Sequence, residues 1–359
     1  MISAVATSLV VALLAPAGPF FSTVPTDPVV PSPPPKVSAV SWAVYDETAD
    51  VMLATWNLNE QRPMASVTKV LTAMIVLDNA DLEEVVTVPA FATSSRGSSA
   101  GLVADEQWTV YDLLVAMLVR SGNDAALTLA WHVGNGDVET FVAMMNDRAA
   151  ELGMDSTRFA NPNGLDHADH YSTANDLVTL AVASLDYPVI QQVSRIKTIK
   201  MPADPTGKIR QVNNTNHLLG TYPGVVGLKT GDTPFADKVL LGVTERGSRR
   251  IVTVVMGSDD HFSDSRELID WAYTTYGLRD RWLRPFFSEQ GGGAIVDARR
   301  IAGGDGAGLF KDRSQRCEFF NVALARFFIG CHDHVTLAAA DRDRRQFVGK
   351  GAVAQRGLG

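Results

Sequence analysis

Residues 63–69 read Pro63-Met64-Ala65-Ser66-Val67-Thr68-Lys69, and the apolar run VLTAMIVLDN follows directly. The apolar residues recur at helical spacing, which predicts a largely buried helix over residues 66–79. Residues three apart share one face of a helix, so Ser66 and Lys69 would lie about 5–6 Å apart. A serine hydroxyl needs a base beside it to act as a nucleophile, and a lysine can be that base when burial lowers its pKa. This stretch therefore predicts a reactive serine and its base at a helix start.

Two further motifs lie downstream. Ser121-Gly122-Asn123 separates two predicted helices, residues 109–120 and 124–133, and its hydroxyl and amide can relay a proton and hold a substrate amide. Lys229-Thr230-Gly231 lies in a predicted strand, where lysine and threonine can bind a carboxylate and glycine lets a ligand backbone approach closely. Taken singly, the three motifs also fit a capping serine, a turn between helices and a solvated strand end.

Strands open and close the globular region, and helices fill its middle. The expected strands are residues 37–45, 51–56, 224–231, 238–244 and 250–256, of which the first two form a hairpin. The other expected helices are residues 137–151, 173–185 and 263–277, and residues 161–166 form a turn. This order predicts an α/β protein of the α+β type, with an antiparallel sheet flanked by helices and an inserted helical lobe.

Composition divides the chain into four parts. Residues 1–22 are apolar and contain no charged residue, so we expect a secretory signal, with a disordered apolar extension as the alternative. Residues 23–36 form a proline-rich linker, residues 37–285 the working domain, and residues 286–359 a tail of different composition. We therefore expect an exported protein on the periplasmic or extracytoplasmic face, whose N-terminal segment would bring it near a membrane.

Charge and cysteine content exclude several kinds of partner. Forty acidic residues outnumber 32 basic ones, giving a net charge of -8, which argues against nucleic acid as the main partner. The two cysteines, Cys317 and Cys331, define neither a disulfide framework nor a zinc site. We expect no metal and no cofactor, and we interpret the histidine-containing stretches 166–170 and 331–334 as solvated loops. The Gly-x-Ser-x-Gly pattern at 97–101 lacks the strand and helix of a nucleophile elbow, so we expect a flexible loop there.

The order and spacing of the three motifs are typical of serine D,D-peptidases and serine β-lactamases. Over residues 37–277, about two thirds of its length, the chain resembles the D-alanyl-D-alanine carboxypeptidase family of low-molecular-weight penicillin-binding proteins. Similar flanking pieces are Asn161-Pro162-Asn163-Gly164-Leu165 and Ser172-Thr173-Ala174. The resemblance implies a β-lactamase/transpeptidase-like fold and a serine-type D,D-carboxypeptidase. Its substrate would be a peptidoglycan stem peptide, and β-lactams would acylate it as inhibitors.

The resemblance also implies a role for each site residue. Ser66 would attack the penultimate D-Ala carbonyl, Lys69 would take its proton, and Ser121 would relay that proton to the leaving D-Ala. Asn123 would hold the substrate amide. Within the last motif, Lys229 and Thr230 would bind the terminal carboxylate, with Gly231 beside them. The backbone N–H groups of Ser66 and Asp232 would form the oxyanion hole.

One departure from the family pattern leaves alternatives open. Asp232 stands where the family more often has an uncharged or aromatic residue, and its carboxylate would pair with Lys229 and oppose an anionic substrate. The alternatives are a D,D-endopeptidase of the same family, a class A-like β-lactamase, or an inactive module that binds cell wall. Class A-like β-lactamases usually carry aspartate at the position where this chain has Gly122.

Overall fold

The computed structural model describes residues 32–203, 207 and 209–276, all of which belong to one unit of the chain, residues 1–286. The expected signal segment, most of the linker, the tail and the stretch 331–334 lie outside the described residues. The domain boundaries drawn from composition therefore remain predictions.

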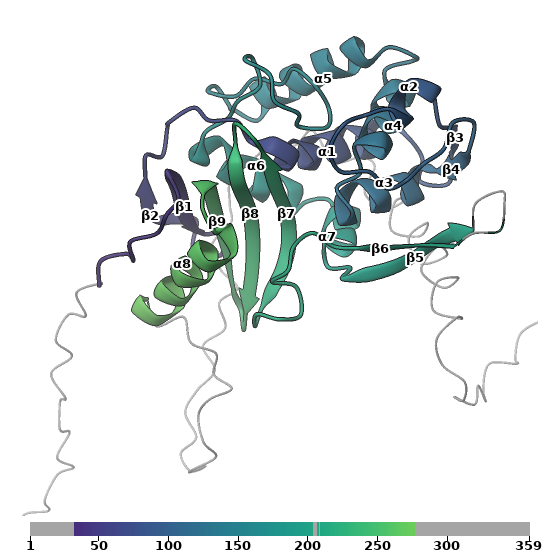
Figure 1. Cartoon of the computed structure of the whole chain (residues 1–359). Coiled ribbons are helices and arrows are strands. Elements are labelled where there is room, and N and C mark those ends of the chain that lie inside the picture. Colours follow the sequence, from purple (N-terminus) through teal and green to yellow (C-terminus); the bar gives the residue numbers. More distant parts are fainter. Residues whose placement is uncertain (1–31, 204–206, 208, 277–359) are drawn as a thin grey trace, which may run out of the picture. The chain divides into compact units, whose positions relative to one another are not determined.

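A five-stranded antiparallel sheet forms the centre of the described region (Figure 1). Its strands are β1 (Ser41–Asp46), β2 (Val51–Trp56), β7 (Val225–Thr233), β8 (Asp237–Arg246) and β9 (Arg249–Ser258). They lie in the order β2-β1-β9-β8-β7, so the first hairpin joins the last strands through β1 and β9, where Trp42 faces Val255. The expected sheet built from both ends of the region is confirmed, and β7 is an edge strand.

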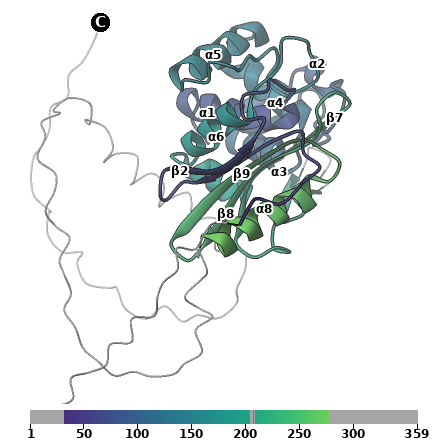
Figure 2. The same ribbon diagram turned by 90° about the vertical axis from the view of Figure 1, so that its left-hand side faces the viewer.

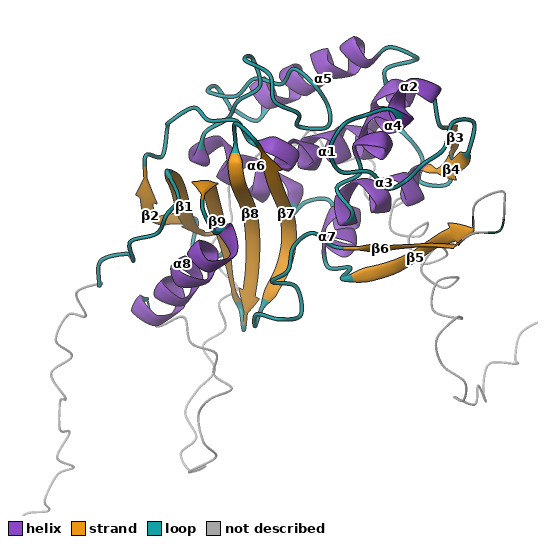
Figure 3. Cartoon of the chain, in the orientation of Figure 1, coloured by secondary structure: helices purple, strands orange, loops and turns teal. Residues whose placement is uncertain are grey.

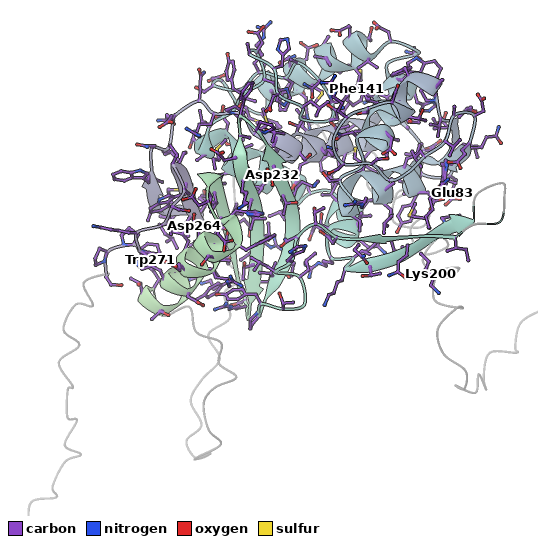
Figure 4. All side chains as sticks on the ribbon, in the orientation of Figure 1. Glu83, Phe141, Lys200, Asp232, Asp264 and Trp271 are labelled. Carbon is purple, nitrogen blue, oxygen red and sulfur yellow. The ribbon has the colours of Figure 1, made fainter. Side chains whose placement is uncertain are left out.

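Helices cover both faces of the sheet (Figure 2). Helix α8 (His261–Thr275), which carries the labelled Asp264 and Trp271 in Figure 4, packs against β8 and β9 on one face. Its apolar side joins the strands in one core cluster that includes Trp42, Val255 and Leu268. Helix α6 (Ala174–Ser184) packs against β1 and β9, and α1 (Lys69–Asn79) lies next to it. Because both faces are covered, strands β1 and β9 are buried along most of their length.

The helical lobe consists of α1 with α3 (Val110–Val119), α4 (Asn123–Val133) and α5 (Val138–Glu151). The expected helices that correspond to α3, α4 and α5 are confirmed to within one residue at each end. Side-chain caps explain two of the boundaries, because Thr109 accepts from Asp112 N and Asp137 accepts from Glu139 N and Thr140 N.

The predicted single helix over residues 66–79 is wrong in its first turn. Residues Ala65–Thr68 form a 3₁₀ turn, η1, and the α-helix begins only at Lys69. Ala65 has a φ of +48°, a left-handed conformation that is costly for a residue with a Cβ, so regular helix cannot extend back through it. Ser66 therefore lies on a 3₁₀ turn that leads into α1. Figure 3 shows α1 among the helices of the lobe.

Several short elements escaped prediction. They are β3 (Val85–Thr87), α2 (Ala90–Thr93), β4 (Gln107–Thr109), α7 (Pro188–Ser194), β5 (Thr198–Ala203) and β6 (Ile209–Asn213). Strands β5 and β6 form a separate hairpin, and β3 pairs with β4. Among the described helices, none is both long and apolar enough to cross a membrane.

Candidate functional site

The predicted nucleophile and base lie within hydrogen-bonding distance. Lys69 Nζ is 2.9 Å from Ser66 Oγ, across the junction between η1 and α1. The lysine side chain is fully buried, whereas Ser66 is partly exposed. The arrangement leaves the hydroxyl open to a substrate and keeps the amine away from water, which is what a serine–lysine pair requires.

Two carbonyl oxygens complete the surroundings of the Lys69 amine. Asn123 Oδ1 lies 2.7 Å from Lys69 Nζ, and the Asn163 main-chain oxygen lies 2.5 Å from it. A carbonyl oxygen can only accept a hydrogen bond, so a neutral amine must direct both of its N–H bonds at these two oxygens. Its lone pair is then left for the third partner, the Ser66 hydroxyl.

Burial lowers the pKa of Lys69 well below its ordinary value, and the positive charge of Lys229 lowers it further. The Asp124 carboxylate acts in the opposite direction, as the smallest of the three causes. Burial and the second cation therefore both favour the neutral amine.

Ser121-Gly122-Asn123 lies where α3 ends and α4 begins, beside the lysine. Ser121 is buried in a left-handed conformation, with a φ of +64°. Asn123 is already engaged at both ends of its amide, because Oδ1 accepts from Lys69 and Nδ2 donates to the Arg96 carbonyl at 2.6 Å. Its second N–H remains for a substrate.

A buried carboxylate holds the loop in front of Asn123. Asp124 accepts from the hydroxyl of Ser99 at 2.6 Å and from the backbone N–H groups of Ala100, Gly101 and Leu102. Asp124 therefore ties residues 99–102 to α4. The segment is a loop, as expected, and its flexibility stays a prediction. The elbow context is absent as expected, since helix α2 precedes this segment rather than a core strand.

Lys229 and Thr230 lie on edge strand β7, and both are buried. Burial lowers the pKa of Lys229 to about 7, and its Nζ donates to the Thr230 carbonyl at 3.1 Å. The Thr230 hydroxyl donates to Thr215 Oγ1 at 2.6 Å. This corner therefore offers one ammonium group and a pair of linked hydroxyls, a set that suits a carboxylate.

Gly231 packs closely against the backbone that carries the serine. A Cβ at this position would lie 2.7 Å from the Ala65 Cβ and 3.1 Å from the Ser66 nitrogen. On the other side, a Cβ at Gly164 would overlap the Ala65 carbonyl group. The two glycines thus allow β7 and the 161–166 turn to pack against the backbone that carries the serine, whereas a ligand backbone was expected to approach Gly231.

The expected pairing of Asp232 with Lys229 is wrong. Within the described part of the chain no ion pair joins these two residues, and Asp232 is not among the causes that shift the pKa of Lys229. Asp232, labelled in Figure 4, is exposed and stands opposite Lys238 in the β7–β8 register. Burial alone accounts for the lowered pKa of Lys229.

Four residues contact or support the site but were not predicted as site residues from the sequence. Asn163 and Thr215 contact Lys69 and Thr230, as described above, and Asp166 accepts from the Thr233 hydroxyl at 2.6 Å. His170 contacts Thr68 Oγ1 at 2.7 Å and is 2% exposed, so its assignment to a solvated loop is wrong. Only the turn residues 161–166 and the polar run 213–216 gave any signal in the sequence. Among the described residues, no group of three or more His, Cys, Asp or Glu side chains is placed to hold a metal ion.

The comparisons with known proteins agree on one family. Its sequence profile, described as D-alanyl-D-alanine carboxypeptidase, matches residues 28–260. A relative from Mycobacterium tuberculosis, D-alanyl-D-alanine carboxypeptidase DacB2, is 36% identical over 67% of this chain and 84% of its own length. An Escherichia coli D-alanyl-D-alanine endopeptidase is 33% identical over 67% of this chain and 79% of its own.

A solved structure shows that the likeness extends to the fold. The crystal structure of the Streptomyces K15 DD-transpeptidase superposes with a TM-score of 0.65 at 28% identity, over 68% of this chain and all of that one. The profile match, the relatives and the shared fold cover the same part of the molecule as the serine–lysine site. The chain belongs to the D-alanyl-D-alanine carboxypeptidase family, peptidase family S11.

Proposed function

We propose that this protein is a serine-type D,D-carboxypeptidase that removes the terminal D-Ala from peptidoglycan stem peptides through an acyl-enzyme on Ser66. One observation carries the proposal. Ser66 Oγ lies 2.9 Å from a buried amine whose two other partners are carbonyl oxygens, so a neutral Lys69 can only accept from the hydroxyl. Family membership and the names of the relatives support the substrate class.

Acylation begins when Ser66 Oγ attacks the carbonyl carbon of the penultimate D-Ala and its proton passes to Lys69 Nζ. The backbone N–H groups of Ser66 and Asp232 stabilise the developing oxyanion. The C–N bond then breaks, and the proton moves through the Ser121 hydroxyl to the departing amine. Water attacks the ester and releases the shortened peptide, with Lys69 again acting as base.

The leaving D-Ala is recognised by its free carboxylate. Lys229 supplies the positive charge, and Thr215, which accepts from Thr230, directs its own hydroxyl proton at the carboxylate. A β-lactam carries a carboxylate at the corresponding place and would acylate Ser66 in the same way. Peptidoglycan lies outside the cytoplasm, so this function requires export, with the apolar N-terminal segment as export signal and as the part nearest the membrane.

The two enzymatic alternatives are separated by different features. A D,D-endopeptidase is the second candidate, because one relative bears that name at 33% identity. The ammonium and linked hydroxyls favour a substrate that ends in a free carboxylate, and so favour carboxypeptidase action. A class A-like β-lactamase is disfavoured, because any side chain at Gly122 would press its Cβ to 2.7 Å from the Asp124 carboxylate.

Release of D-Ala from an N-acylated L-Lys-D-Ala-D-Ala tripeptide tests the proposal. We expect stoichiometric release by the wild type and none by Lys69→Arg, because arginine stays protonated and cannot serve as base. A cross-linked stem-peptide dimer should be cleaved more slowly than the tripeptide. Faster cleavage of the dimer would show that the protein is an endopeptidase. Release of D-Ala at the wild-type rate by Lys69→Arg would contradict the mechanism.

A further inference from the structure

We propose that His170 is a positioning residue for the oxyanion hole. Its ring holds the Thr68 hydroxyl on the Ala65 carbonyl and thereby fixes the direction of the Ser66 N–H. The inference rests on the proposed function, which uses that N–H to stabilise the oxyanion. His170 itself touches neither Ser66 nor Lys69 among the hydrogen bonds of the described residues, so it acts through Thr68.

The directions of the hydrogen bonds follow from what each group can donate. The backbone N–H of Ala160 donates to His170 Nδ1 at 3.0 Å, so Nδ1 carries no proton. In the neutral ring the proton is then on Nε2, which must donate to Thr68 Oγ1 at 2.7 Å. The single hydroxyl proton of Thr68 is left to donate to the Ala65 carbonyl at 2.8 Å. The result is a one-way chain from the Ala160 N–H to the Ala65 oxygen.

The surroundings of the ring favour this neutral form. His170 is buried, and Phe159 packs against it edge to face at a centroid distance of 5.7 Å. Burial lowers the pKa of His170 to about 4, and the neighbouring His167 and Lys69 act in the same direction. A protonated ring would place a second donor opposite the Ala160 N–H and break the chain at its start.

Peptide planarity carries the effect to the reaction centre. The Ala65 carbonyl and the Ser66 N–H belong to the same planar peptide unit and point in opposite directions. A hydrogen bond that fixes the carbonyl oxygen therefore also fixes the N–H. Ala65 needs such support, because its φ of +48° is unfavourable for a residue with a Cβ. The backbones of Gly164 and Gly231 both pack closely against the same peptide unit.

This arrangement predicts a particular kinetic signature. The oxyanion forms only during acylation, so a misdirected N–H should slow acylation at saturating β-lactam and leave the non-covalent affinity nearly unchanged. Complete loss of one oxyanion donor costs about 10²–10³ in rate, and a donor that is present but poorly held should cost about 10- to 100-fold.

The test is the acylation of the full chain by a fluorescent penicillin, with the saturating rate and the half-saturating concentration measured separately. His170→Leu and Thr68→Val each remove one hydrogen bond of the series that runs from the Ala160 N–H to the Ala65 carbonyl. His170→Gln keeps an acceptor for Ala160 and a donor for Thr68, and Thr68→Ser keeps the hydroxyl. We expect both link-breaking variants to lose about 10- to 100-fold in the saturating rate alone, whereas the two conservative variants stay near wild type.

The double variant His170→Leu/Thr68→Val should be no slower than the slower single variant, because the two substitutions interrupt the same series of hydrogen bonds. Independent, multiplicative losses would overturn the proposal, as would a wild-type saturating rate in Thr68→Val. Thr68→Val decides the question even if His170→Leu does not fold, since valine keeps the shape of threonine. If the wild type itself is not labelled, or if Ser66→Ala is, then the proposed function fails instead.

Discussion

The hydroxyl of Thr230 donates to the hydroxyl of Thr215 at 2.6 Å, and this bond sets the direction of the second hydroxyl. Thr215 already accepts from Thr230, so its own proton is available to a ligand. The backbone N–H of Thr215 donates to the Val119 carbonyl at 3.2 Å, which ties it to the end of α3, two residues before Ser121. The carboxylate pocket and the proton relay are thus held together by one loop residue.

Replacing Thr215 by valine should therefore weaken the binding of substrates that end in a carboxylate. A hydrogen bond to a charged group is worth about 1.5–3 kcal/mol, and for this partly exposed hydroxyl we expect KM to rise about 10-fold with kcat nearly unchanged. Thr215→Ser, which keeps the hydroxyl, is the matched control. A substrate amidated at its C-terminus should not distinguish the variants, and an equal loss with that substrate would show that Thr215 acts on the fold instead.

The pKa of Lys229, lowered by burial to about 7, predicts how activity depends on pH. Above pH 7 the free enzyme loses the ammonium that binds the carboxylate, so kcat/KM for a tripeptide with a free carboxylate should fall about tenfold per pH unit. The C-terminal amide substrate should lack this falling limb. A falling limb of the same position and slope for both substrates would show that another group is responsible.

Two glycines with similar positive φ angles provide a matched test of the close packing at the nucleophile. Gly153 and Gly164 have φ values of +74° and +81°, but a Cβ at Gly153 would meet nothing within 4 Å, whereas one at Gly164 would overlap the Ala65 carbonyl. Gly153→Ala should cost about 1 kcal/mol in the free energy of unfolding, and Gly164→Ala about 2 kcal/mol more.

Only Gly164→Ala should also slow acylation, because it displaces the peptide unit before Ser66. Chemical denaturation and penicillin labelling of the two variants check both statements. Equal stabilities and equal labelling rates would refute the role given to Gly164.

The lowered pKa of His170 also predicts acid sensitivity of the fold. The folded pKa is about 4, and the ordinary value of 6.5 applies to the unfolded chain. Between these values only the unfolded state binds the proton, so stability falls as pH drops from 6.5 to 4, by about 3 kcal/mol for a shift of this size.

His170→Gln should remove this share of the pH dependence. Burial also lowers the pKa of His261 to about 4. His261 should therefore still contribute a loss of stability of similar size, at the same acidic pH, in the variant. Urea denaturation at several pH values measures both contributions. An unchanged slope in His170→Gln would mean that the ring is not held neutral.

Much of the fold was predictable because its signals are local. The apolar spacing of α3 and α5 and the β-branched runs of β8 and β9 mark these elements within windows of about ten residues. Strands β3 and β4 have three residues each, too few for a period to be recognised. The 3₁₀ turn at Ser66 escaped because the φ of Ala65 is set by what packs against it, and a helical pattern cannot reveal that.

The site was predictable as a set of motifs, but its supports were not. Ser66 and Lys69 are three residues apart, so helical spacing alone brings them together. His170 lies 102 residues from Thr68 in the chain, and Asn163 lies 94 residues from Lys69. No periodicity spans such distances. Gly231 was noticed, but whether a ligand or the Ala65 backbone occupies the space beside it depends on the packing of β7 against η1.

The mass of the protein after reaction with benzylpenicillin tests the central claim most directly. The wild type should gain the mass of one penicillin, peptide mapping should locate it on Ser66, and Ser66→Ala should gain nothing while unfolding at the wild-type temperature. An adduct on Ser66→Ala, or one located on the Asp124-bound Ser99 of the wild type, would contradict the account.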